Sequence, residues 1–195
     1  MQMRFKIGAC VVATFAGILL AQEATRERAA GSVAAAGTEL AAILASGYDA
    51  AGAEARATLT PSLVAWLETF RDDAIARGAE PMPAELRAAF DGYLPDEVLD
   101  SVRWRIDAGS VLIGQNIFQA GVRAVTLDNV ILFASAEEAA NAKLWAHELF
   151  HVQQYRQWGV ASFVERYLAD GSAIEREAWE FRWQWMKATG RVPAA

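Results

Sequence analysis

The chain has 195 residues, of which 54% are hydrophobic and 22% are charged. This is enough for a folded domain with a core and excludes a wholly disordered protein. The formal net charge of −6 at pH 7 argues against a nucleic-acid-binding protein, because such a protein needs basic surface to neutralise phosphates. The single cysteine, Cys10, excludes a framework of disulfide bonds.

The amino-terminal segment, residues 1–21, has the features of a secretory signal peptide. Arg4 and Lys6 precede an unbroken run of small and apolar residues, Ile7 to Ala21, which correspond to the basic and hydrophobic regions of such signals. The run is shorter than the about 20 residues that a membrane-spanning helix needs. We therefore predict an exported protein, periplasmic or secreted. The alternative is that an uncleaved segment anchors the protein to the membrane.

The next region, residues 22–83, is rich in alanine and contains no motif with recognisable chemistry. Pro61 with Ser62 is typical of a helix start, and Gly78 of a helix end. We interpret the region as a helical spacer or packing partner, and Pro81 to Pro83 as its boundary with a domain over residues 84–195. Alanine content and apolar spacing predict helices over Glu23 to Ala36, Thr38 to Ala45 and Leu63 to Arg77.

The remainder of the chain predicts an α+β fold, mainly α-helical with a small β-sheet. Runs rich in β-branched and aromatic residues predict strands, and Asp128-Asn129 predicts a turn between the last two. The strands are expected over Val102 to Ile106, Val122 to Leu127 and Val130 to Phe133.

Helices are predicted before and after these strands in the sequence. Three of them open with a serine followed three residues later by a glutamate, the spacing of a capping box: Ser135/Glu138, Ser162/Glu165 and Ser172/Glu175. Gly159, Gly171 and Gly190 are predicted to end these three helices. The helices are expected over Ala84 to Phe90, Pro95 to Val102, Ser135 to Trp158, Ser162 to Ala169 and Ser172 to Thr189.

The motif that carries chemistry is His-Glu-Leu-Phe-His at residues 147–151. On a helix, positions i and i+4 share one face, so the rings of His147 and His151 can bind one Zn²⁺ ion. Glu148 projects beside that face, where its carboxylate can take a proton from metal-bound water. The chain has only two histidines, and both fall in this motif. The alternative, two histidines that only pack in the core, explains this coincidence poorly.

A catalytic zinc site commonly has three protein ligands and an open position. Without a third histidine or a usable cysteine, the third ligand must be an aspartate or glutamate. Glu175 and Glu177 are the leading candidates, on a helix that can lie against the motif, and Glu165 and Asp170 are the others. Glu175 has a competing role as the capping-box partner of Ser172.

The segments around the motif resemble a zincin-like family, the extracellular contractile injection system (eCIS) core domain. Its members pair an A-H-E-L-x-H-V-x-Q motif with a downstream glutamate in a segment like E-R-E-A. The resemblance covers residues 84–182, a little over half of the chain. It rests on Val102 to Arg105, Ala124 to Phe133, Leu144 to Tyr155, Trp158-Gly159, Phe163, Arg166 to Leu168 and Glu175 to Ala178.

The resemblance implies a metallopeptidase core of the gluzincin type. In related zincins with an E-x-x-A-D or E-x-x-A-N segment, the glutamate three residues before the alanine is the third ligand. This maps to Glu175 and not to Glu177. Trp179 stands where those zincins often have an aspartate or asparagine that supports the site.

We therefore expect a zinc-dependent metallopeptidase, a hydrolase of peptide or protein substrates. His147, His151 and Glu175 would bind Zn²⁺, and Glu148 would act as general base. Candidates for stabilising the oxyanion are Tyr155, Tyr167 and Arg176. The alternative is a non-catalytic, zinc-stabilised scaffold or interaction module with a degenerate peptidase fold.

Overall fold

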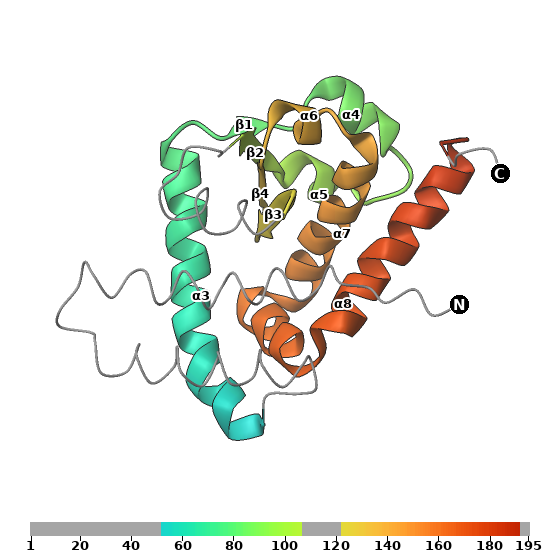
Figure 1. Cartoon of the computed structure of the whole chain (residues 1–195). Helices are drawn as coiled ribbons and strands as arrows, with labels where there is room; N and C mark the ends of the chain where they lie inside the picture. Colours follow the sequence, from blue (N-terminus) through green and yellow to red (C-terminus); the bar gives the residue numbers. More distant parts are fainter. Residues whose placement is uncertain (1–51, 107–121, 192–195) are drawn as a thin grey trace.

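The computed structural model describes residues 52–106 and 122–191 (Figure 1). The predicted signal peptide and the predicted helices at residues 23–36 and 38–45 lie outside these ranges. The described elements are, in chain order, α3 (Ala53–Ala76), β1 (Glu80–Pro81), α4 (Ala84–Ala89), α5 (Asp96–Ser101), β2 (Arg103–Ile106), β3 (Ala124–Leu127), β4 (Val130–Phe133), α6 (Ala136–Ala139), α7 (Ala142–Trp158) and α8 (Val160–Ala188).

The four strands form one mixed sheet in the order β1-β2-β4-β3. β2 runs parallel to β4, whereas the pairs β1–β2 and β3–β4 are antiparallel. Leu127 pairs with Val130 across the Asp128-Asn129 turn, and Asp128 has a positive φ of 57°, a conformation that aspartate tolerates. The three predicted strands and their turn are confirmed, as is the mainly helical α+β class. β1, a two-residue strand at the predicted boundary, was not predicted.

Helix α3 begins ten residues earlier than Leu63, the predicted start, and Pro61 lies inside it. The prediction was wrong because Pro61 removes only one backbone donor, while alanine-rich flanks and packing favour continuing the helix. Leu59, before the proline, is fully buried. The predicted end is confirmed, since the helix stops before Gly78, whose φ is 88°.

The segment predicted as one helix over Ser135 to Trp158 consists of two helices. Ser135 caps α6 by accepting a hydrogen bond from the Glu138 backbone amide, which is one half of the predicted capping box. The Glu138 carboxylate pairs with Arg123. Asn141 then starts α7, because its side-chain oxygen accepts from the amides of Lys143 and Leu144. This second cap was missed.

The two helices predicted after Gly159 are confirmed as two helical segments, which meet at a kink and together carry the label α8. Asp170 has non-helical angles (φ −157°, ψ 76°), and its carboxylate accepts a hydrogen bond from the Ala173 amide. Ser162 and Ser172 lie within these segments and do not cap them, so both of those predicted capping boxes were wrong. The break itself falls at Asp170, between the predicted last residue, Ala169, and Gly171. The predicted end at Gly190 is confirmed by its φ of 67° after the helix.

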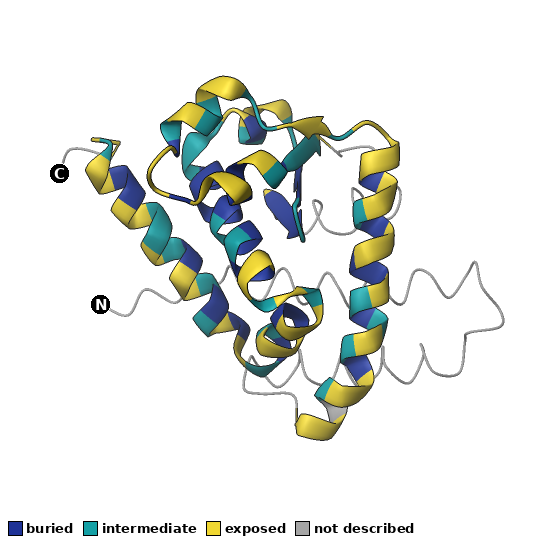
Figure 2. Cartoon of the chain, turned by 180° about the vertical axis from the view of Figure 1, so that it is seen from behind, coloured by how far each residue is buried: buried dark blue, intermediate teal, exposed yellow. Residues whose placement is uncertain are grey.

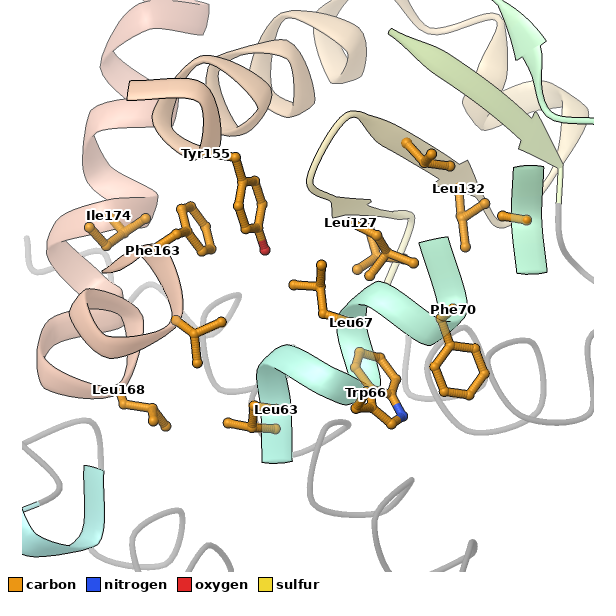
Figure 3. Close-up of a cluster of buried hydrophobic side chains, with 14 of the residues drawn as sticks. Leu63, Trp66, Leu67, Phe70, Leu127, Leu132, Tyr155, Phe163, Leu168 and Ile174 are labelled. Carbon is orange, nitrogen blue, oxygen red and sulfur yellow. The ribbon is translucent and has the colours of Figure 1, made fainter. Parts of the chain in front are cut away.

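Helix α7 lies between the sheet and α8, and α3 packs both on α8 and on the β3–β4 hairpin (Figure 1). The face of α3 toward the molecule is buried and the opposite face is exposed (Figure 2). A hydrophobic cluster joins α3 to the β3–β4 hairpin, the end of α7 and α8 (Figure 3). α3 therefore packs across the predicted boundary at residues 83–84. The labelled members of this cluster are Leu63, Trp66, Leu67, Phe70, Leu127, Leu132, Tyr155, Phe163, Leu168 and Ile174.

A second cluster fills the space between the other side of the sheet, α5, α7 and the end of α8. Its largest fully buried side chains are Trp145, Trp185, Phe90 and Phe133. The Trp145 and Trp185 indoles donate hydrogen bonds to the carbonyls of Ala139 and Ala89. Both clusters contact α7, so the buried face of the helix that carries the H-E-x-x-H motif is held by packed side chains.

Candidate metal centre

His147 and His151 project from the same face of α7, as their spacing predicts. Their Nε2 atoms are 3.2 Å apart, and both residues are buried. They lie in the central part of α7, where the backbone is fixed by helical hydrogen bonds on both sides. Both rings therefore point to one place without depending on a loop.

Helix α8 brings Glu175 to the same place. Its Oε2 lies 3.2 Å from His147 Nε2 and its Oε1 lies 3.6 Å from His151 Nε2. The three residues are the group that could hold a metal ion among the described residues. Glu175 enters this group because α8 continues past its bend at Asp170 and runs back along α7 (Figure 1).

The donor atoms of the cluster lie close to the spacing that a zinc ion requires. Ligands bonded to Zn²⁺ at about 2.0–2.1 Å in a tetrahedral arrangement lie about 3.3 Å from one another. The two Nε2 atoms are 3.2 Å apart, and they lie 3.2 and 3.6 Å from the two different oxygens of Glu175, Oε2 and Oε1. One ligand atom from each of the three residues lies within 4.8 Å of the others. Two imidazole nitrogens and one carboxylate oxygen are also the donor types that Zn²⁺ prefers, and three ligands leave one position open. The residues present fit a zinc ion.

The electrostatics of the cluster favour opposite charges on histidine and glutamate. Burial alone lowers the pKa of His151, but the negative charge of Glu175 and the hydrogen bond to it raise the pKa to about 9. Burial alone raises the pKa of Glu175, but the charge of His151 and the hydrogen bonds to both histidines hold the pKa well below its usual range. In the metal-free protein the carboxylate therefore stays ionised, and a cation at this position is favoured.

Glu148 lies on the side of α7 that faces the sheet and is buried. Its Oε2 accepts a hydrogen bond of 2.7 Å from the hydroxyl of Thr126 in β3. The hydroxyl also lies 3.4 Å from the Glu148 carbonyl oxygen. Thr126 was not among the residues predicted for the site. Thr126 is the one polar residue in the strand Ala124–Leu127, and this was the signal that could have identified it. Sequence alone does not show which polar group it contacts.

Gln154 is the second residue that sequence reasoning missed, although it belongs to the motif quoted above. Its Oε1 lies 2.8 Å from His151 Nδ1, and its Nε2 donates to Glu177 Oε2 at 2.9 Å. Gln154 is 1% exposed. A polar side chain buried to this degree needs partners, and this requirement was the signal that could have singled it out.

The other predicted candidates have different positions. Asp170 caps the second part of α8, and Glu165 is exposed. Among the residues suggested for the oxyanion, Tyr155 lies in the hydrophobic cluster (Figure 3) and Arg176 is exposed. Tyr167 is in contact with the site, since its hydroxyl donates to Glu175 Oε1 at 2.9 Å.

Trp179 closes one side of the cluster. The centroid of its ring lies 5.0 Å from that of His147. The guanidinium of Arg182, three residues further along α8, lies 4.4 Å from the centroid of the same indole. The Nδ1 atom of His147 is buried and has no hydrogen-bond partner among the described residues. An aromatic ring thus packs on His147 at the position where the sequence resemblance raised the question of a polar supporting residue.

Comparison with known proteins found a similarity to one protein family for part of the chain. No curated protein and no solved structure matches it. Within residues 52–106 and 122–191, no helix combines the length and apolar character needed to cross a membrane. The model of the eCIS core domain matches residues 81–159, a range that contains His147, Glu148 and His151 and ends before Glu175. The match shows that residues 81–159 are similar to the eCIS core domain.

Proposed function

We propose that this protein is a zinc-dependent metallopeptidase with a zincin-like core. The observation that carries the proposal is the convergence of three metal-binding groups from two helices, with the two histidine Nε2 atoms 3.2 Å apart and each within 3.6 Å of an oxygen of Glu175. His147 and His151 would bind the ion through Nε2 and Glu175 through its carboxylate. A bound Zn²⁺ supplies Lewis acidity, which polarises a carbonyl group and makes a water molecule more acidic.

Glu148 would move the proton in this reaction. It directly follows His147 on α7, and its carboxylate is held at one oxygen by Thr126. The second oxygen is left to accept a proton from water and to pass it to the leaving amine, as a general base and then a general acid. Fixing the carboxylate from β3 keeps it from turning away, and orientation of this kind is a large part of catalytic efficiency.

Tyr167 would orient the carboxylate ligand. Its hydroxyl donates a hydrogen bond to Glu175 Oε1. This bond would favour one rotamer of the Glu175 side chain. Hydrogen bonds to the ligands of a metal typically change metal affinity by about 10–100-fold. This contact supports a positioning role for Tyr167 rather than the oxyanion role considered from the sequence.

A non-catalytic zinc-stabilised module is the second candidate. It is favoured by the packing of Trp179 on His147 and by the deep burial of the site, with His147 7% and His151 5% exposed. Structural zinc sites, however, almost always have four protein ligands, and the described cluster has three. The ligand count favours the catalytic alternative.

The proposed substrate is a peptide or protein that the enzyme meets after export. The family description names an extracellular system, which supports an exported protein, periplasmic or secreted. Anchoring by an uncleaved amino-terminal segment is the alternative. Amino-terminal sequencing of protein from the native host, with fractionation of the cells, distinguishes cleavage near Gln22 from retention of residues 1–21.

The test of the proposed function combines metal analysis with the Glu148→Gln variant. We expect the parent protein to bind one equivalent of zinc and to cleave an unstructured protein substrate such as casein. Glu148→Gln should retain zinc and lose cleavage, because a neutral amide cannot take the proton. Glu165→Gln, a change of an exposed glutamate on α8, is the matched control. Zinc binding without cleavage in the parent would instead support the non-catalytic module.

A further inference from the structure

Gln154 makes hydrogen bonds to both helices of the metal cluster. On its own helix, α7, the Oε1 atom lies 2.8 Å from His151 Nδ1. On α8, the Nε2 atom lies 2.9 Å from Glu177 Oε2 and 3.4 Å from the Ile174 carbonyl oxygen. We propose that Gln154 is a positioning residue that holds His151 with Nε2 toward the metal, and that Glu177 fixes the direction of the Gln154 amide.

The partners of Gln154 determine which way its amide points. The carboxylate of Glu177 and the carbonyl of Ile174 are both acceptors. They must therefore face the NH₂ group of Gln154, which places the carbonyl oxygen toward His151. If the amide were turned over, its oxygen would face two acceptors, and its NH₂ would face Nδ1.

The direction of the amide in turn determines the protonation of the His151 ring. Because Gln154 offers an acceptor, Nδ1 of His151 carries the hydrogen. In a neutral imidazole the other nitrogen, Nε2, then has its lone pair free. Nε2 is the atom that faces His147 and Glu175. The hydrogen-bond chain from Glu177 through Gln154 thus presents the ligand nitrogen to the metal.

Gln154 also connects the helix of the histidines to the helix of the third ligand. Ile174 and Glu177 stand on either side of Glu175 in α8, so the two contacts of Nε2 hold the segment that carries Glu175. Gln154 itself is buried, so the loss of its partners leaves an unsatisfied group and is costly. A single side chain therefore fixes the ring of one ligand and the backbone beside another.

The two histidines differ in this respect. His147 Nδ1 has no hydrogen-bond partner among the described residues, whereas His151 Nδ1 faces Gln154. Loss of Gln154 should consequently affect the His151 ring and not that of His147. A change confined to the His151 ring would therefore distinguish the loss of this hydrogen bond from a general loss of packing between α7 and α8.

The test uses Gln154→Leu, which keeps the size of the side chain and removes both polar groups. Gln153→Leu is the matched control, since Gln153 is the neighbouring glutamine of α7 and is less buried. Zinc affinity is measured by competition with a chromophoric chelator. Long-range ¹H–¹⁵N spectra of the zinc-bound protein report the ring nitrogens, and assignment needs only two histidines. The melting temperature of each metal-free variant reports folding.

We expect Gln154→Leu to lower zinc affinity by about 10–100-fold, the range for residues that support a ligand. The Nδ1–H signal of His151, slow to exchange in the parent, should exchange with water or disappear, while the His147 signals stay in place. Gln153→Leu should change neither. Parent-like affinity and an unchanged His151 signal in Gln154→Leu would overturn the proposal.

A second variant keeps the inference testable if Gln154→Leu does not fold. In the double variant Gln154→Glu/Glu177→Gln, the acceptor toward His151 is kept and the donor and acceptor between positions 154 and 177 are exchanged. We expect this variant to regain parent-like zinc affinity, whereas Gln154→Glu alone places two carboxylates together and should bind less tightly. Equal affinities for the single and double variants would contradict the role of Glu177.

The inference rests on the proposed metal site but not on peptidase activity. If the parent protein binds no zinc, the proposed function fails. If the parent binds zinc and the Gln154 variants bind it equally well, the proposed function stands and the positioning role of Gln154 fails.

Discussion

The hydroxyl of Thr126 donates a 2.7 Å hydrogen bond to the carboxylate of Glu148, which joins strand β3 to the centre of helix α7. Both residues are buried, with 7% and 5% of their surfaces exposed. A buried carboxylate needs hydrogen-bond donors, and Thr126 supplies one from an otherwise apolar strand. The sheet therefore positions the residue that we propose as the general base.

Thr126→Val tests the contribution of this hydrogen bond while the packing of the strand is kept. Valine keeps the shape of threonine and removes the hydroxyl, so the Glu148 carboxylate loses this donor. We expect the free energy of unfolding to fall by about 1–3 kcal/mol and peptidase kcat to fall while zinc affinity is kept. Denaturant unfolding and zinc titration measure the two effects. Thr126→Ser retains the hydroxyl and serves as the control. Parent-like stability of Thr126→Val would show that this bond contributes little.

Part of the metal cluster could be predicted from the sequence, because two of its residues are neighbours on one helix. The positions of His147 and His151 follow from a helix and a spacing of four residues, and the structure brings them together. Glu175 was reached through a family resemblance and not through spacing. Thr126 and Gln154 were missed because their roles depend on how α7 packs on β3 and α8. Contacts of this kind are not encoded in local patterns.

The errors in the helix predictions have a common physical origin. Ser172 and Glu175 have the capping-box spacing, but the helix had already been started by Asp170, whose carboxylate accepts from Ala173. The Glu175 side chain then points to the histidines and Tyr167 instead of returning to the backbone. Pro61 was interpreted as a start although α3 runs through it. In each case packing outweighed a local signal that is worth about 1–3 kcal/mol.

Leu67→Ala should show how far α3 contributes to the fold of the metal site. Leu67 is 1% exposed and belongs to the cluster that joins α3 to the sheet, α7 and α8. We expect a loss of about 2–5 kcal/mol, with the whole described region unfolding in one transition. Thermal unfolding followed by circular dichroism and by tryptophan fluorescence measures this. Val64→Ala, at a partly buried position of the same helix, should cost less. Separate transitions by the two probes would indicate that α3 is an independent unit.

The stability of the metal-free protein should depend on pH through His151 and Glu175. The pKa of His151 is raised from 6.5 to about 9, so its stabilising effect is complete below about pH 6.5 and is lost as the pH rises toward 9. The pKa of Glu175 is lowered from 4.5, so its effect is present above about pH 4.5 and is lost at lower pH. The pair therefore contributes most between these values.

Zinc should reverse the alkaline part of this dependence, because the metal binds neutral imidazole. We expect the increase in melting temperature on adding zinc to be small near pH 6 and to grow toward pH 9. In Glu175→Gln without metal, the decline of stability above pH 6.5 should largely disappear, since the charge that raises the pKa of His151 is gone. A zinc-induced increase that is the same at both ends of this range would contradict the prediction.

Tyr167→Phe should weaken zinc binding without unfolding the protein. The change removes the hydroxyl that donates to Glu175 Oε1 and keeps the ring, which stacks on Phe163 at 5.8 Å. We expect zinc affinity to fall by about 10-fold, the lower end of the effect of residues that support a ligand. Tyr155→Phe, in the hydrophobic cluster, is the control and should bind zinc like the parent. Equal binding by both variants would remove Tyr167 from the site.

Glu175→Gln and Glu177→Gln should differ strongly in zinc affinity, because only the first changes an atom of the cluster. Glu175 lies 3.2 Å from His147 Nε2, and a neutral amide is a poor replacement for a carboxylate on Zn²⁺. We expect this variant to lose more affinity than the about 100-fold limit for supporting residues, and to lose activity. Its helix should persist, since Asp170 caps that part of α8.

Glu177→Gln keeps an acceptor oxygen for Gln154 and should therefore change zinc affinity only slightly. Glu180→Gln, at an exposed position of the same helix, provides the reference for removing one negative charge from α8. Zinc titrations of the three variants measure the differences, and metal-free melting curves show that each is folded. If Glu177→Gln lost zinc and Glu175→Gln kept it, the third ligand would lie two positions further along α8. Parent-like binding by both variants would exclude Glu175 and Glu177 as the third ligand.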